Sequence, residues 1–169
     1  MKTLLSFLVV LVLLAALAPV LLKNLLGKRG PSSDGLPYKK KDYLLTAAER
    51  SFYEVLCSIM DNQLHVFPKV RLMDLVYLPK GTENWQTHKN RVISKHVDFV
   101  LCDRQNIAPV LVIELDDASH EREDRKERDA FLDKALAAAS LPILHVPAKR
   151  SYAPKELAEL IQQKLQQVP

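Results

Sequence analysis

Two neighbouring apolar runs decide the fold: HVDFVLC at residues 96–102 and PVLVIEL at residues 109–115. The first run alternates, with Val97, Phe99 and Leu101 on one face, as in a strand with one buried side. The second run is continuously apolar, which is typical of a central strand covered on both faces. Together they predict two adjacent strands in a sheet that helices enclose.

The segments around these runs complete an α/β domain. Thr46 and Glu49 form a capping-box pattern that marks a helix start. Helices are predicted over residues 46–60, 121–139 and 154–167, and a further strand over residues 141–146. Within residues 64–78 we predict a strand that begins after Pro68, and we expect residues 79–94 to form a loop or an irregular crossing segment. A strand, helix and strand at this spacing imply a parallel crossover. We therefore predict a mixed β-sheet flanked by helices, in the order α-β-β-β-α-β-α.

The N-terminal residues predict a membrane anchor. Residues 3–22 carry no charge, and twenty helical residues rise about 30 Å, the thickness of the hydrocarbon core. Lysines follow this run, so the positive-inside rule places the next segment in the cytoplasm. An A-x-A pattern at residues 16–18 leaves a cleavable signal peptide as the alternative. We expect a transmembrane helix over 1–24, a basic flexible linker over 25–42 and one folded domain over 43–169.

Composition narrows the function classes only a little. The formal net charge of +4 over 169 residues permits nucleic-acid binding without indicating it. Cys57 and Cys102 lie far apart, each in an apolar stretch, so we expect free buried thiols, as in a reducing compartment. The oligomeric state stays open.

Carboxylates occur where the predicted strands are most apolar. Asp98 lies inside the first run, and Glu114 and Asp116 lie at the end of the second. Burying an unpaired charge is costly, and alternate residues of a strand share a face. On adjacent strands these carboxylates would form an oxygen-rich site for Mg²⁺ or Mn²⁺, an ion that can polarise a phosphate and activate water. The competing interpretation is a solvated strand end.

The pattern resembles the PD-(D/E)XK nuclease superfamily, the fold of many restriction endonucleases. There a helix carries a Glu, a strand an Asp and the next strand an E-x-K motif. Glu49, Asp98 and Glu114 fall at those places. The resemblance covers most of residues 43–150 and implies a restriction-endonuclease-like fold and a Mg²⁺-dependent endonuclease activity on DNA.

A closer resemblance is to a bacterial family of unknown function, number 2726, whose relatives resemble the very-short-patch repair endonucleases. It is carried by KHVDFVLCD, IELDDASH and RKERD at residues 95–103, 113–120 and 125–129. A bacterial source and the predicted anchor imply a single-pass inner-membrane protein whose folded domain is cytoplasmic.

One position departs from the superfamily, because Asp116 stands where the E-x-K lysine is expected. That lysine stabilises developing negative charge and helps to position the attacking water. Either another group takes over this role, with His120 as a general base, or the domain binds without catalysing. The cationic candidates for the first case are Lys95, Arg125 and Arg128. Glu49 and Asp129 are further accessory candidates for the site.

The expected function is a membrane-anchored, metal-dependent nuclease that hydrolyses DNA phosphodiesters. We predict Asp98, Glu114 and Asp116 as metal ligands and, with His120, as the catalytic residues. The alternative is a catalytically degenerate nuclease fold that binds nucleic acid or a protein partner at the membrane.

Three further side chains have structural interpretations. We expect His145 to be a hydrogen-bonded core histidine and Trp85 to pack its loop onto the core. Lys69 faces either solvent or a phosphate.

Overall fold

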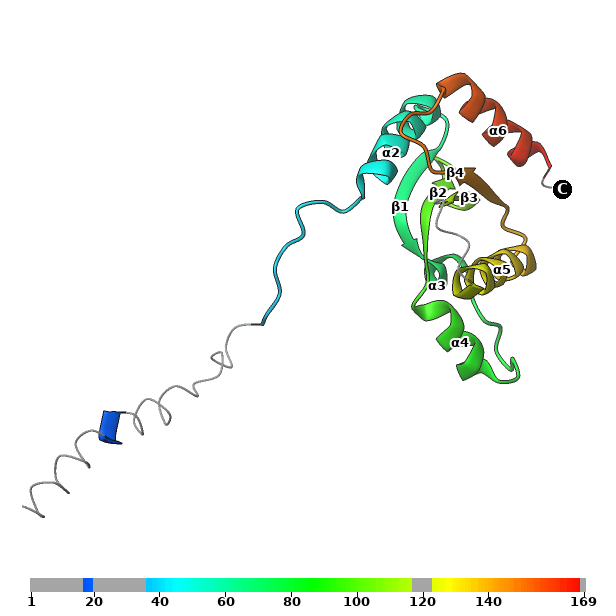
Figure 1. Ribbon diagram of the computed structural model, residues 1–169. Helices are drawn as coiled ribbons and strands as arrows, with labels where there is room; N and C mark the ends of the chain where they lie inside the picture. Colours follow the sequence, from blue (N-terminus) through cyan, green and yellow to red (C-terminus); the bar gives the residue numbers. More distant parts are fainter. Residues whose placement is uncertain (1–16, 20–35, 117–122, 168–169) are drawn as a thin grey trace, which may run out of the picture. The chain divides into compact units, whose positions relative to one another are not determined.

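The computed structural model describes residues 17–19, 36–116 and 123–167 (Figure 1). The chain divides into two compact units, Met1–Asp42 and Tyr43–Pro169. Apart from residues 17–19, the predicted transmembrane helix lies outside the described residues, so the anchor stays a prediction. Within the described ranges, no helix combines the length and the apolar character needed to cross a bilayer.

The second unit has a four-stranded mixed sheet in the order β1-β2-β3-β4. The strands are β1 (His65–Arg71), β2 (His96–Cys102), β3 (Pro109–Asp116) and β4 (Ile143–Pro147). β1, β2 and β3 form an antiparallel meander, and β3 pairs with β4 in parallel. The predicted mixed sheet, with its crossover, is therefore confirmed.

Helices cover both faces of this sheet, as Figure 1 shows. They are α2 (Ala47–Met60), α3 (Leu72–Leu75), α4 (Trp85–Ile93), α5 (Glu123–Ala138) and α6 (Pro154–Gln166). One core cluster joins α2 and α6 to the sheet through Phe52, Phe99 and Ile161, and the other joins α3, α4 and α5 to it around Val100 and Leu136. Two hydrophobic cores thus hold the central strands from both sides.

The segment between β1 and β2 differs from the prediction. The strand expected to begin after Pro68 instead spans His65–Arg71, and the next residues form the short helix α3. The segment 79–94, expected to be a loop or an irregular crossing, contains α4, of which only Val92 is buried. A helix with so little buried apolar surface has no clear hydrophobic period, and this is why the sequence pattern missed it.

Two local predictions are confirmed. The Thr46 hydroxyl accepts a hydrogen bond from the Glu49 amide at 3.3 Å, and the Glu49 carboxylate accepts one from the Thr46 amide at 2.8 Å. This capping box fixes the start of α2 and the orientation of the Glu49 side chain. Cys57 and Cys102 are both free thiols, as predicted, but only Cys102 is buried, and Cys57 is half-buried.

Candidate functional site

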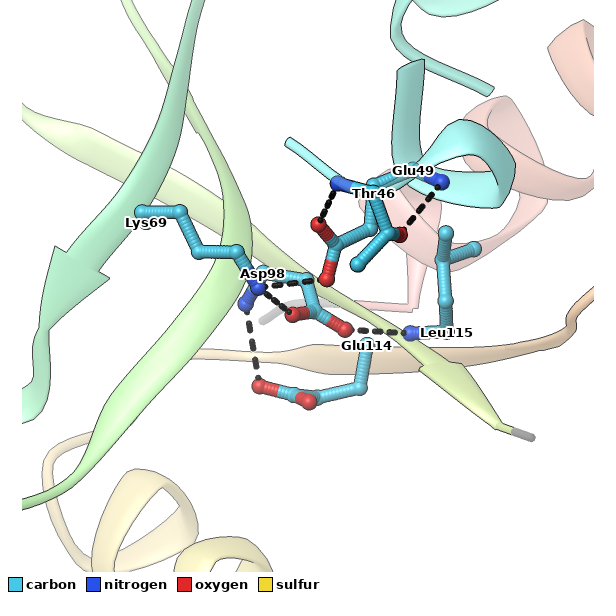
Figure 2. Close-up of polar contacts among 6 residues, drawn as sticks. All are labelled: Thr46, Glu49, Lys69, Asp98, Glu114 and Leu115. Atoms are coloured by element: carbon cyan, nitrogen blue, oxygen red, sulfur yellow. Dashed lines mark hydrogen bonds and ion pairs between the residues drawn. The ribbon is translucent and has the colours of Figure 1, made fainter. Parts of the chain in front are cut away.

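The candidate site lies where β2 and β3 stop pairing through their backbones. The regular register includes Phe99 opposite Ile113. At the next positions, the Asp98 amide donates a hydrogen bond to Glu114 Oε1 at 3.2 Å, and the Leu115 amide donates one to Asp98 Oδ2 at 3.1 Å (Figure 2). Side-chain carboxylates thus accept the hydrogen bonds that backbone carbonyls would accept in a continuous ladder, and this explains how two acids lie within an apolar sheet.

Lys69 of β1 faces these carboxylates. Its ammonium lies 2.8 Å from Asp98 Oδ1 and 2.5 Å from Glu49 Oε1 (Figure 2). Lys69 sits between the registered pairs Pro68–Phe99 and Val70–Val97, and its φ is +56°. A residue other than glycine in this left-handed region costs about 1–3 kcal/mol, and such strain gathers at functional sites.

The ion pairs fix the charge states of both partners. Partial burial lowers the pKa of Lys69, but its hydrogen bonds to Asp98 and Glu49 outweigh burial and leave the pKa above its ordinary value. Burial raises the pKa of Glu49, whereas hydrogen bonds from Lys69 and Thr46 lower it, with a net decrease. These shifts favour the charged forms of the Lys69 ammonium and of the Glu49 carboxylate at neutral pH.

A pocket of about 250 Å³ opens beside this cluster. Its acidic wall includes Asp98, Glu114 and Asp116, and Asp129 of α5 adds a fourth carboxylate. Its other walls are formed by Lys69, by His145 and by residues 94–96, which include Lys95. Glu114 is the deepest of the acids, with 8% of its surface exposed.

His145 of β4 connects two carboxylates at the pocket wall. Its Nδ1 lies 3.0 Å from Asp116 Oδ1, and its Nε2 lies 3.0 Å from Asp133 Oδ1 of α5. The imidazolium form of His145 can donate a hydrogen bond to each of these two carboxylates at once. Burial lowers the pKa of His145, but the bonds to Asp116 and Asp133 outweigh it and raise the pKa above its usual value.

A family model described as a protein of unknown function (DUF2726) matches residues 41–165. The chain belongs to this family. The match includes every residue that lines the pocket. No curated protein and no solved structure matches the chain, so the interpretation of this DUF2726 domain rests on its own residues.

The structure brings most of the predicted site residues of the DUF2726 domain together. Asp98, Glu114 and Asp116 line one pocket with the accessory candidates Lys95 and Asp129. Glu49 joins them through Lys69. His120 lies outside the described residues, as do the side chains of Arg125 and Arg128. No role for these three side chains is therefore tested.

Carboxylate oxygens, the ligands that hard divalent cations prefer, line the pocket. In the part of the chain that the structure describes, no three His, Cys, Asp or Glu side chains are grouped to hold a metal ion. Asp116 lines the pocket, but its carboxylate bonds to His145. Mg²⁺ is usually held by one or two carboxylates together with substrate phosphates rather than by an all-protein cage. The adjacent pair Asp98 and Glu114 suits this mode.

Two site residues of the DUF2726 domain were missed from the sequence. The sequence pattern gives Lys69 no partner, because only the antiparallel pairing of β1 with β2 places it opposite Asp98. His145 was predicted to be a core histidine; it is hydrogen-bonded and half-buried, but its partners are carboxylates and it lines the pocket. In both cases the missing signal was the pairing of distant strands.

Proposed function

We propose that this DUF2726 protein is a metal-dependent nuclease that hydrolyses DNA phosphodiesters, with a PD-(D/E)XK-like site. The observation that carries the proposal is Lys69, whose ammonium contacts Glu49 and Asp98 beside Glu114. The E-x-K motif lacks its lysine, because Asp116 occupies that position. Lys69 supplies a cation from β1, which pairs with the strand that carries Asp98, in place of the lysine expected on β3.

Each residue of the cluster has a role in this proposal. Asp98 and Glu114 hold Mg²⁺ or Mn²⁺, which when bound polarises the phosphate and activates water. Lys69 stabilises the negative charge that develops on the phosphoryl oxygens, because its ammonium stays protonated in a partly dehydrated site. The contact with His145 holds the Asp116 carboxylate in its orientation at the pocket wall. His120 is the proposed general base.

Cleavage of supercoiled plasmid DNA by the full-length chain tests this function. We expect nicking with Mg²⁺ or Mn²⁺ and none with EDTA. Glu114→Gln should lower the rate at least about 100-fold, the scale for loss of one transition-state contact. Lys155→Gln, an exposed position on α6, is the control and should keep full activity. Equal inactivity of wild type and Glu114→Gln on duplex and single-stranded DNA with both metals contradicts the proposal.

A non-catalytic binding module is the second candidate. It is favoured by the ion pairs of Lys69, which satisfy Glu49 and Asp98 without a metal. Calorimetry with Mn²⁺ separates the two candidates. Binding that Asp98→Ala abolishes favours the nuclease, whereas DNA binding with no detectable Mn²⁺ affinity favours the module.

The inner-membrane location is also part of the proposal, and it rests on the uncharged residues 3–22 and the lysines that follow. A fluorescent-protein fusion at the C-terminus tests it. We expect a fluorescent fusion that stays in the membrane fraction after an alkaline wash. Release by that wash would contradict the anchor, and cleavage near residue 18 would favour the signal peptide.

A further inference from the structure

The segment from Asn84 to Val97 is a cationic stretch of chain that leads to the pocket. It contains Lys89, Arg91 and Lys95, two histidines and no Asp or Glu. Its first part is α4, and residues 94–96 at its end line the pocket. One continuous piece of chain therefore joins an exposed helix to the pocket that holds the carboxylates.

The cations of this segment are not neutralised. Within residues 36–116 and the described part of 123–167, neither Lys89, Arg91 nor Lys95 has a carboxylate within ion-pair distance. By contrast, Lys69 forms ion pairs with Glu49 and Asp98. Arg71 forms an ion pair with Asp74. Among the described side chains, cations without an ion-pair partner thus follow α4 and the turn after it as far as the pocket.

Aromatic rings hold these cations in place. The Lys89 ammonium lies 4.9 Å from the centroid of the Trp85 ring, and Arg91 and Lys95 lie 4.2 Å and 5.4 Å from that of Phe131 on α5. A cation–π contact orients a charged group without cancelling its charge. Arg91 and Lys95 also offset the partial negative charge at the C-terminal end of α4. The segment is therefore a positioned cationic surface.

We infer that α4 and residues 94–96 form the binding surface for the phosphodiester backbone of DNA and lead one strand to the pocket. The inference rests on the proposed function for the identity of the substrate. Charge complementarity selects a polyanion, and Trp85, with 40% of its surface exposed, offers a ring for base stacking. The nine residues of α4 extend about 14 Å, which matches about four steps of one strand at about 3.4 Å per step.

DNA binding in EDTA tests the surface without cleavage. The full-length chain, in a non-ionic detergent, is titrated against fluorescein-labelled 20-mer DNA, single-stranded and duplex, at several salt concentrations. We expect the triple variant Lys89→Gln, Arg91→Gln, Lys95→Gln to bind at least tenfold more weakly. For duplex DNA, the dependence of log affinity on log salt should become shallower by about 2–3, at about 0.9 per lost phosphate contact.

A matched control removes the same charges elsewhere. Arg104, Lys155 and Lys164 lie on the β2–β3 hairpin and on α6, and their change to Gln should alter affinity less than twofold. If both triple variants weaken binding equally, the attraction is general and the surface is refuted. If the triple variant misfolds by circular dichroism, the double variant Lys89→Gln, Lys95→Gln, which keeps Arg91 on Phe131, should still weaken binding at least threefold.

Trp85 gives a direct signal, because it is the only tryptophan of the chain. DNA bound along α4 should quench its fluorescence, and the triple variant should lose the quenching. Poly-glutamate at equal charge is the competitor. If it binds and quenches as strongly as DNA, the surface fits an acidic peptide and the inference is overturned.

The two proposals can fail separately. If DNA binding depends on Lys89, Arg91 and Lys95 but no metal condition gives cleavage, the binding surface is supported and the nuclease proposal is contradicted. If metal-dependent cleavage occurs and these substitutions leave it unchanged, the nuclease proposal is supported and the binding surface is contradicted.

Discussion

Lys69 and Lys95 line the same pocket, but their charges are handled in opposite ways. Lys69 lies between two carboxylates, with 30% of its side chain exposed. Lys95 lies over an aromatic ring and has no ion-pair partner among the described residues. A paired lysine fixes the geometry of its neighbours, whereas an unpaired one leaves charge available to a ligand. The pocket therefore has one wall whose charges are already paired, at Lys69, and another whose positive charge is available to a ligand, at Lys95.

The largest expected effect is on catalysis, where the two lysines should differ most. Lys69→Met should lower plasmid cleavage at least about 100-fold, because it removes a cation from the reacting centre. Lys95→Met should lower it less than about tenfold, mainly through weaker substrate binding. Initial rates at saturating and subsaturating DNA measure both. Equal losses for the two variants would mean that the walls of the pocket do not differ in role.

The next effect concerns folding. Lys69→Met should reduce the free energy of unfolding by about 1–3 kcal/mol, because it leaves partly buried carboxylates without their charged hydrogen-bond donor. Lys95→Met should reduce it by less than about 1 kcal/mol, the scale of an exposed cation–π contact. Urea denaturation at neutral pH checks both values. A larger loss for Lys95→Met would reverse the comparison.

The smallest effect is the pH dependence that His145 contributes. Its folded-state pKa is raised above the ordinary value of 6.5. The stabilisation that comes from its protonation is therefore fully present below pH 6.5. This contribution is lost as the pH rises through the folded-state pKa. The difference in unfolding free energy between wild type and His145→Gln should therefore be largest in acid and shrink in alkali. A difference that stays constant from pH 5 to pH 9 would show that His145 does not titrate with folding.

The sequence predicted the central strands well because their burial dictates their residues. The runs 96–102 and 109–115 differ from β2 and β3 by at most one residue, since alternation and continuous apolarity are direct signatures of one-sided and two-sided burial. The crossover helix was recovered from its charged and Ala-rich composition, and the helix 154–167 from the apolar face that contains Leu157 and Ile161. α3 and α4 were missed because they bury few side chains.

The site was only partly predictable. Asp98, Glu114 and Asp116 stand out because acids in apolar strands are unusual. Lys69 does not stand out, because a lysine on an outer strand is ordinary and its left-handed backbone has no sequence signal beyond the preceding Pro68. A constellation assembled from strands far apart in the chain needs the register, and the register comes from the fold.

Glu49 has one further consequence for the molecule. One of its carboxylate oxygens caps α2 through the Thr46 amide, and the other contacts Lys69. The two tasks use different atoms, so a ligand that draws the ammonium away would leave the helix end hydrogen-bonded. Binding of a ligand at the pocket should therefore leave the first turn of α2 in place. Lys69 can exchange Glu49 for a ligand without loss of the capping hydrogen bond.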